Sequence, residues 1–224
     1  LRLEATRGTD LAFRLDAPRA GDLWRLLGVP RESNLPLALR GRARVESDAW
    51  HLDETTLKLG RSDLTIDAHR SGIGGRPVIV AALRSTLIDA PELETLRARQ
   101  SAPADGKIDV PILPYGIDLE DADLGLGLQR AVLGRAELAD VGFGARIREG
   151  RLPPSPFAAI FAGVPFEGLF GLDLRSDVPE VSLAMSTGRT DVGALLRRLR
   201  VAEDIDGHAD ALQVEITGRG SRLS

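Results

Sequence analysis

The chain has 224 residues, of which 43% are hydrophobic and 28% are charged, and its formal net charge is −4 at pH 7. A chain with this acidic balance lacks the basic footprint that nucleic-acid binding needs, so we expect no nucleic-acid partner. It contains no cysteine, which excludes disulfide bonds and thiolate metal sites. Aromatic residues make up only 4%, and the apolar content is mainly aliphatic, which favours a β-rich fold with little stacking surface.

Most of the predicted elements are short strands in which apolar and polar residues alternate, the period expected of half-buried strands. In the first part of the chain, strands are expected at residues 1–5, 11–15, 35–47, 50–59, 62–70 and 77–84. Helical turns are expected at residues 22–27, with Asp22 as the N-cap, and at residues 91–99. Further strands are expected at residues 122–128, 136–148, 166–175, 179–187 and 209–217, with a third helix at residues 191–200.

Two segments of the second half depart from the simple alternating pattern. Residues 153–166 contain no charged residue and include four prolines, so we expect a connection there and no strand. Gly125 and Gly127 alternate with leucines, which leaves the second face of their strand without side chains. This arrangement favours the close approach of a neighbouring backbone, or alternatively a bend in the sheet.

A strand, a polar corner, an aspartate and a short Leu-rich helical segment follow one another three times along the chain. The aspartates are Asp22, Asp89 and Asp191; Asp89 lies six positions after Leu83, and Asp191 lies six positions after Met185. A recurring strand-and-helix unit is typical of repeat architectures, in which each unit covers the apolar face of its neighbour.

We therefore predict a mainly β fold with short helices, in which a curved antiparallel sheet forms a segment of a repeating β-groove. Consecutive strands at short spacing favour antiparallel pairing, and the helices are too few to cover a whole face of the sheet. The expected division is a groove unit or units at residues 1–100, a linker-like segment at residues 101–114 and a second groove unit at residues 115–224. Because the chain begins with Leu and not with Met, we expect it to be a piece of a longer protein.

Two stretches of the sequence resemble the AsmA-like family, the AsmA/TamB-type repeating β-groove proteins of the bacterial envelope. Residues 35–45 and then 57–66 are similar to the unit of that family in which a strand, a glycine and a second strand precede an LG-x-S-x-L-x-G turn. Asp67 or Ala68 stands where that unit usually has glycine. Residues 150–157, 168–174, 179–183, 190–196 and 207–221 resemble the carboxy-terminal region of the family in order and spacing.

The resemblance implies a function in the outer-membrane lipid homeostasis of a Gram-negative bacterium. The chain would be the periplasmic portion of a protein anchored in the inner membrane, with the anchor outside this fragment. Its groove would transfer phospholipid in the manner of a bridge, and proteins of the inner or outer membrane would be partners at the ends of the groove. Members of the family are also linked to the assembly of outer-membrane proteins.

A phospholipid needs a dry track for its acyl chains, and burial returns about 0.8 kcal/mol for each CH₂ group. The strands supply aliphatic side chains for such a track. The predicted groove residues are Leu11, Phe13, Leu15, Leu64, Ile66, Ile79, Ala81, Leu83, Leu124, Leu126, Leu128, Phe170, Leu172, Leu174, Val181, Leu183 and Met185. Alternatively, the same side chains pack the core of a closed β-sandwich. An alternative function is a scaffold that assists the assembly of outer-membrane proteins through exposed strand edges.

Residues that could carry catalysis or bind a metal form no recognised pattern. The histidines are His51, His69 and His208, and neither His51 with its acidic neighbours nor His69 with Asp67 matches a recurrent ligand spacing. Ser155 lacks the G-x-S-x-G surroundings of a nucleophile elbow. We therefore predict no catalytic residue, no metal site and no cofactor, and we expect the chain not to be an enzyme.

Overall fold

The structure is a computed structural model, and it describes residues 9–26, 33–46, 49–73, 76–94, 110–111, 121–134, 136–176, 178–219 and 222–223. The first strands are β1 (Thr9–Ala17), β2 (Leu37–Val45), β3 (Trp50–Leu59), β4 (Ser62–Ile73), β5 (Arg76–Ser85) and the short β6 (Ile88–Asp89). Two helices accompany them, α1 (Ala20–Leu26) and α2 (Ala90–Glu94). The prediction of a mainly β fold with short helices is confirmed.

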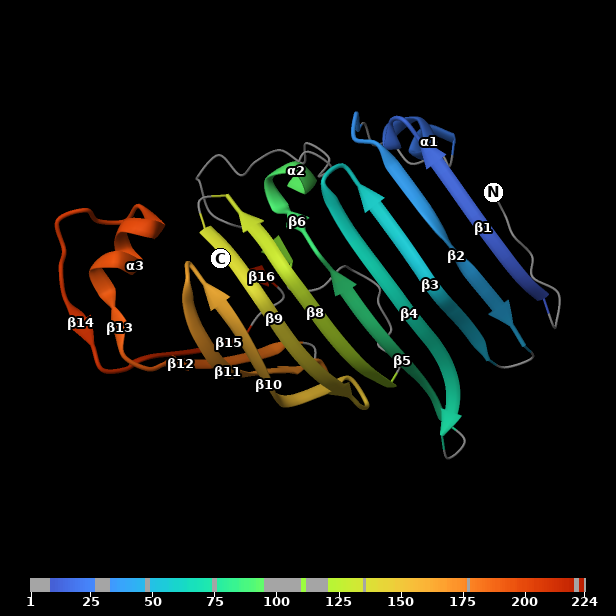
Figure 1. Ribbon diagram of the computed structural model, residues 1–224. Coiled ribbons are helices and arrows are strands. Elements are labelled where there is room, and N and C mark those ends of the chain that lie inside the picture. Colours follow the sequence, from blue (N-terminus) through green and yellow to red (C-terminus); the bar gives the residue numbers. More distant parts are fainter. Residues whose placement is uncertain are drawn as a thin grey trace.

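The later part of the chain continues the same architecture (Figure 1). Its long strands are β8 (Asp121–Leu133), β9 (Ala136–Ile147), β10 (Arg151–Phe161), β11 (Val164–Asp173), β12 (Glu180–Thr187) and β15 (Leu212–Arg219). Its short elements are β7 (Val110–Pro111), β13 (Thr190–Asp191), α3 (Val192–Leu199), β14 (His208–Ala209) and β16 (Arg222–Leu223).

The long strands form one open sheet in the order β1-β2-β3-β4-β5-β8-β9-β10-β11-β12-β15. Figure 1 shows that the sheet is curved, and that the strands from β10 onward turn away from the plane of the earlier ones. Every junction along this path is antiparallel except that between β5 and β8, which is parallel. The prediction of a wholly antiparallel sheet is therefore wrong at this junction. The connection that contains β6 and α2 brings the chain back to the end of the sheet where β5 begins. β8 starts there, beside Val78, and therefore runs in the same direction as β5.

The proline-rich segment is a strand and not the connection that we expected. β10 pairs with β9 on one side and with β11 on the other, and its register with β11 shifts between Leu152 and Ser155. Pro153 and Pro154 lie within this irregularity, where the hydrogen-bonded ladder is already interrupted. Proline has no N–H to donate, so a bulge tolerates it inside a sheet.

The helices agree in part with the predictions. α3 follows Asp191, whose carboxylate accepts a hydrogen bond of 2.8 Å from the backbone N–H of Ala194, as an N-cap does. α1 begins at Ala20, so Asp22 lies inside its first turn and is not the predicted N-cap. Residues 95–99 of the second predicted helix lie outside the described residues.

The second and third copies of the sequence repeat have the same structure. In each copy, a long strand (β5 or β12) leads to a two-residue strand (β6 or β13) and then to a helix (α2 or α3). Each helix also contacts a neighbouring β-turn: the backbone N–H of Arg61 donates a hydrogen bond of 2.7 Å to the carboxylate of Glu92 in α2, and Arg198 of α3 donates a hydrogen bond of 2.9 Å to the carbonyl of Ala162. These two helices therefore lie at corners of the sheet.

The sheet passes without a break from the first predicted groove unit to the second, through the pairing of β5 with β8. Of the predicted linker at residues 101–114, only the two residues of β7 are described, and these pair with β16. The division of the chain into units stays a prediction.

Candidate functional site

The register of the strands gathers apolar side chains on one face of the sheet. Directly opposed residues of neighbouring strands point to the same face, so rows of residues can be followed across the sheet. Across β1 to β4 one row contains Leu15, Leu39, Leu57 and Leu64. From β4 to β10 another row contains Ile66, Leu83, Leu126, Phe143 and Phe157. A third row, across β11, β12 and β15, contains Phe170, Leu183 and Ile216. We call the surface formed by these rows and their same-face neighbours the apolar face.

The predicted groove residues that lie within strands all belong to the apolar face. Those on β1, β4 and β5 are Leu11, Phe13, Leu15, Leu64, Ile66, Ile79, Ala81 and Leu83. Those on β8, β11 and β12 are Leu124, Leu126, Leu128, Phe170, Leu172, Val181, Leu183 and Met185. Leu174 lies just beyond the end of β11. The alternation placed these side chains on one side of each strand, and the register joins those sides into one face of the sheet.

Other residues of the apolar face were missed by the sequence analysis. They lie on β2, β3, β9, β10 and β15, and include Leu37, Leu39, Leu57, Val141, Phe143, Phe157, Val214 and Ile216. Most belong to predicted strands, where the same alternation identifies them. Phe157 had no such signal, because the prolines around it argued against a strand.

The apolar face is curved inward where the sheet turns. Phe143 of β9 and Phe170 of β11 meet edge to face, with ring centroids 6.0 Å apart, although β10 lies between their strands. Around them, Ala122, Ala145 and Leu152 are buried. Side chains of non-adjacent strands converge in this way on the concave side of a curved sheet, so the apolar face is the concave one.

The aliphatic side chains of this face are only half-buried. Among the described residues, no large side chain is fully buried, and Ile216 on β15 is 50% exposed. The chain exposes 15409 Å², whereas a compact protein of 24.0 kDa is expected to expose about 9,900 Å². The described strands form one large sheet and two two-stranded ones, not the two facing sheets of a sandwich. These observations argue against the alternative of a closed sandwich core.

Aromatic rings on the apolar face lie over glycines of the neighbouring strand. A Cβ atom on Gly41 would come within 2.9 Å of the Phe13 ring, and one on Gly168 within 2.8 Å of the Phe157 ring. Each pair is directly opposed in the register. Such a ring fills the space that the glycine leaves and covers its backbone.

The opposite face, which we call the polar face, carries charged residues and a bare strip of glycines. Gly125 opposes Gly144 and Gly127 opposes Gly142 on β8 and β9. A Cβ atom at any of these positions would meet nothing within 4 Å. The expectation that a close backbone neighbour explains Gly125 and Gly127 is therefore wrong, because the space above them is open.

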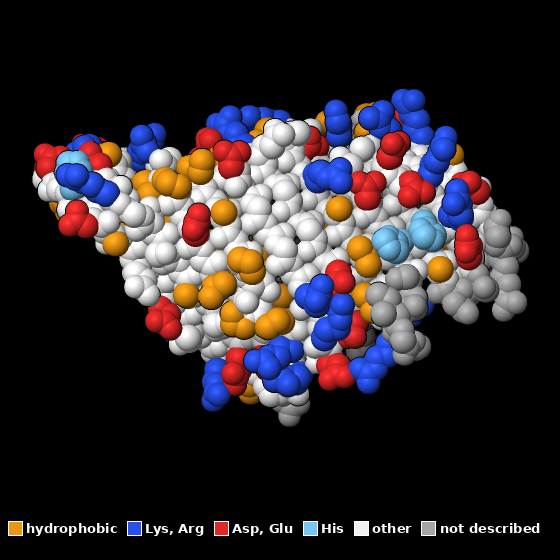
Figure 2. All heavy atoms as spheres, turned by 60° about the horizontal axis from the view of Figure 1, so that its bottom comes forward, with side chains coloured by type: hydrophobic (Ala, Val, Ile, Leu, Met, Phe, Trp, Pro, Cys, Tyr) orange, Lys and Arg blue, Asp and Glu red, His pale blue; other side chains and the backbone are white. Residues whose placement is uncertain are grey.

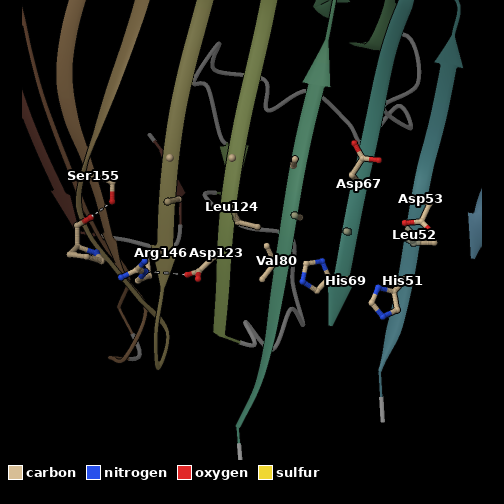
Figure 3. Close-up of a pocket in the computed structure, with 17 residues that line it drawn as sticks. His51, Leu52, Asp53, Asp67, His69, Val80, Asp123, Leu124, Arg146 and Ser155 are labelled. Atoms are coloured by element: carbon tan, nitrogen blue, oxygen red, sulfur yellow. Dashed lines mark hydrogen bonds and ion pairs between the residues drawn. The ribbon is translucent and has the colours of Figure 1, made fainter. Parts of the chain in front are cut away.

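A groove of about 770 Å³ lies on the polar face beside this strip (Figures 2 and 3). Charged and polar side chains of four strands line it, namely His51, Asp53, Asp67, His69, Asp123 and Arg146, together with small or apolar residues such as Val80, Ala82 and Gly144. Asp123 forms ion pairs with Arg146 at 3.3 Å and with Arg148 at 2.7 Å. Ser155 also borders the groove, and its hydroxyl donates a hydrogen bond of 2.8 Å to the carbonyl of Pro153.

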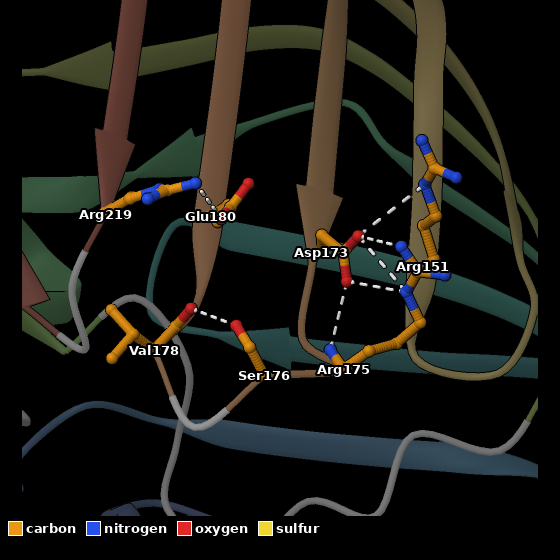
Figure 4. Close-up of polar contacts among 7 residues, drawn as sticks. All are labelled: Arg151, Asp173, Arg175, Ser176, Val178, Glu180 and Arg219. Carbon is orange, nitrogen blue, oxygen red and sulfur yellow. Dashed lines mark hydrogen bonds and ion pairs between the residues drawn. The ribbon is translucent and has the colours of Figure 1, made fainter.

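The strand ends below the curved part of the sheet carry a row of ion pairs (Figure 4). Asp173 contacts Arg175 at 2.5 Å and Arg151 at 3.7 Å, and Glu180 contacts Arg219 at 2.7 Å. Hydrogen bonds from the side chain and the backbone of Arg175 lower the pKa of Asp173 to about 2. These strand ends therefore carry charges at neutral pH and border the apolar face.

Within the part of the chain that the structure describes, no group of three or more His, Cys, Asp or Glu side chains is arranged to hold a metal ion. Across the same residues, the helices are too short and too polar to cross a lipid bilayer.

Comparisons of the chain with protein-family models, with curated proteins and with solved structures find no match. The resemblance to the AsmA-like family thus rests on the sequence motifs alone and stays a prediction.

Proposed function

We propose that this chain is a segment of a periplasmic, bridge-like phospholipid transfer protein whose apolar face holds the acyl chains. The observation that supports this proposal is the continuity of the apolar face from β1 to β15 without a fully buried large side chain among the described residues. Neighbouring strands lie about 4.8 Å apart, so the face runs for roughly 50 Å along the sheet.

The physical mechanism is passive movement along a track. An acyl chain on the apolar face gains about 0.8 kcal/mol for each CH₂ group removed from water, and the gain is similar at every strand. The headgroup stays at the rim, where charged strand ends such as those of Arg151 and Asp173 remain in contact with water. Movement of this kind needs no bond chemistry and no cofactor. Proteins of the inner and outer membranes would receive or supply the lipid at the two ends.

The test is native mass spectrometry with lipid extraction on the protein purified from a bacterial host. We expect phospholipid to co-purify with the wild type and to be lost in Leu126→Glu and Leu183→Glu. An acyl chain on the apolar face would have to remove the new carboxylate from water, and the free-energy cost of this desolvation weakens lipid binding. Matched controls place the same charge on the polar face of the same strands, as Gly127→Glu, above which nothing lies within 4 Å, and Ser186→Glu.

The circular dichroism spectrum and the urea midpoint of each variant separate lipid loss from unfolding. Retained folding with lost lipid supports an open track. A lipid-free wild type, together with unfolding of Leu126→Glu, would mean that the apolar residues form a closed core, and the proposal would fail.

A second candidate function, a scaffold for outer-membrane proteins, is favoured by the exposed edge of the sheet. β15 pairs only with β12 among the described strands, and its residues are exposed from Gln213 to Arg219. An open edge with apolar side chains such as Val214 and Ile216 can accept a further strand. Glu215→Pro should abolish the binding of a synthetic outer-membrane β-strand peptide and leave bound lipid unchanged. Leu126→Glu should abolish lipid binding and leave the binding of the peptide unchanged.

A further inference from the structure

Two of the three histidines of the chain meet on the polar face. His51 of β3 and His69 of β4 are directly opposed in the antiparallel register. Their rings stack with centroids 5.6 Å apart and an angle of 14° between their planes. Figure 3 shows them side by side on the wall of the polar groove, and both side chains are half-buried and reachable from solvent.

We propose that His51 and His69 together chelate one divalent transition-metal ion. Imidazole nitrogen is a preferred ligand of Cu²⁺, Ni²⁺ and Zn²⁺, with metal–nitrogen distances of about 2.0–2.1 Å for zinc. Opposed residues of antiparallel strands have Cβ atoms about 4.5–5.5 Å apart. At that separation, rotation of both rings about their side-chain torsions directs one nitrogen of each to a common point above the sheet.

The surroundings of the pair are suited to a cation. Asp53 and Asp67 line the same groove, and the backbone N–H of Glu54 holds Asp67 through a hydrogen bond of 2.9 Å. Two arginines on the same face have acidic partners of their own. Arg44, which opposes His51 on β2, lies 3.7 Å from Asp10, and Arg84 lies 3.5 Å from Asp67.

The site is expected to be bidentate and open. Because the described residues contain no group of three metal-binding side chains, the protein supplies two nitrogens, and water occupies the other positions. The groove of about 770 Å³ leaves room for that water. Such a site exchanges its ion more readily than a closed structural zinc site with four protein ligands. This proposal does not depend on the lipid-binding proposal, since it concerns the opposite face of the sheet.

The experiment is calorimetric titration of the protein, without an affinity tag, with Cu²⁺, Ni²⁺ or Zn²⁺ alone at neutral pH. The expected result is one bound ion per chain, with the Cu²⁺ form showing two equatorial nitrogen ligands in its electron paramagnetic resonance spectrum. His51→Ala and His69→Ala should each weaken binding by about 10- to 100-fold or more, since loss of a ligand costs at least as much as loss of an outer-shell partner.

The chain provides its own control, because His208 is the remaining histidine and no cysteine is present. His208 lies away from the pair, 4.0 Å from Asp191, so His208→Ala should leave the titration unchanged. The proposal fails if the wild type does not bind the ion, or if His51→Ala or His69→Ala binds it as tightly as the wild type does. Loss of binding in His208→Ala would also overturn it. Circular dichroism of the variants shows whether each of them is folded.

Discussion

At the scale of single residues, carboxylates hold the corners of this sheet. Asp63 at the start of β4 accepts hydrogen bonds from the backbone N–H groups of Thr86 and Leu87, at 2.7 and 3.1 Å, and from the Ser85 hydroxyl at 3.0 Å. Burial alone would raise the pKa of Asp63, but these bonds, together with one from the Thr86 hydroxyl, lower it below its ordinary value. Asp63 therefore ties the turn after β5 to the start of β4.

Replacing Asp63 tests this anchoring role. Asp63→Ala leaves several donors without their acceptor, and we expect a loss of about 1–3 kcal/mol in the free energy of unfolding, measured by urea denaturation. Asp63→Asn keeps one acceptor oxygen and should lose less. Equal loss in the two variants would show that the charge, and not the set of accepted bonds, matters.

The lowered pKa of a second carboxylate, that of Asp173, predicts how the stability of the protein depends on pH. The pKa of Asp173 is lowered from 3.8 to about 2 by its bonds to Arg175, so its contribution is present above the unfolded pKa and is lost as the pH falls through the folded one. Stability should therefore decrease between pH values of about 4 and 2. Thermal unfolding across this range should show a smaller decrease for Asp173→Asn than for the wild type, and an unchanged slope would contradict the prediction.

At the scale of elements, the strands use glycine in two different ways. Gly168 lies under the Phe157 ring and close to the carbonyl oxygen of Ala184, with which a Cβ atom would overlap, whereas Gly127 faces open space. The alternation in the sequence shows that both glycines lie in strands. It does not show which one is covered, since that depends on a neighbouring strand that the pattern does not identify.

This difference predicts opposite results for the same substitution. Gly168→Ala should destabilise the protein by about 1–3 kcal/mol, because the neighbouring strand must move. Gly127→Ala should be neutral or stabilise the protein slightly, since alanine loses less backbone entropy than glycine on folding. Urea denaturation of the two variants checks the prediction, and similar stabilities for both would show that the contacts around Gly168 are not rigid.

At the scale of the whole molecule, the open sheet buries less surface than a compact protein does. The chain exposes 15409 Å² at a mass of 24.0 kDa, so folding buries about 19,400 Å², about one fifth less than the roughly 24,900 Å² expected for a compact chain. Large side chains that remain half-exposed on the concave side account for part of this difference, and they are the surface that the proposed function uses.

The urea dependence of unfolding measures this property directly. Its slope scales with the surface exposed on unfolding, so we expect a slope about one fifth below that of compact proteins of the same length. Leu126→Glu should change the midpoint little if the face is open. A slope equal to that of compact proteins would indicate that the apolar face is covered in solution.

The sequence by itself determined the class of fold and the composition of the two faces. Alternation with period two is a local property, so it identified most strands and placed residues such as Leu11, Leu126 and Leu183 on one side of each. The helix at Val192–Leu199 was predictable for the same reason, because its N-cap lies next to it in the chain.

Only the tertiary structure decided which strands are neighbours, and with it the parallel pairing of β5 and β8, the strand through Pro153 and Pro154, and the meeting of His51 with His69. Pairing depends on hydrogen bonds between segments that are distant in the sequence and on a register that a single-residue shift would reverse. The two histidines lie on strands whose alternation is equally compatible with other partners, so their contact follows from the register alone.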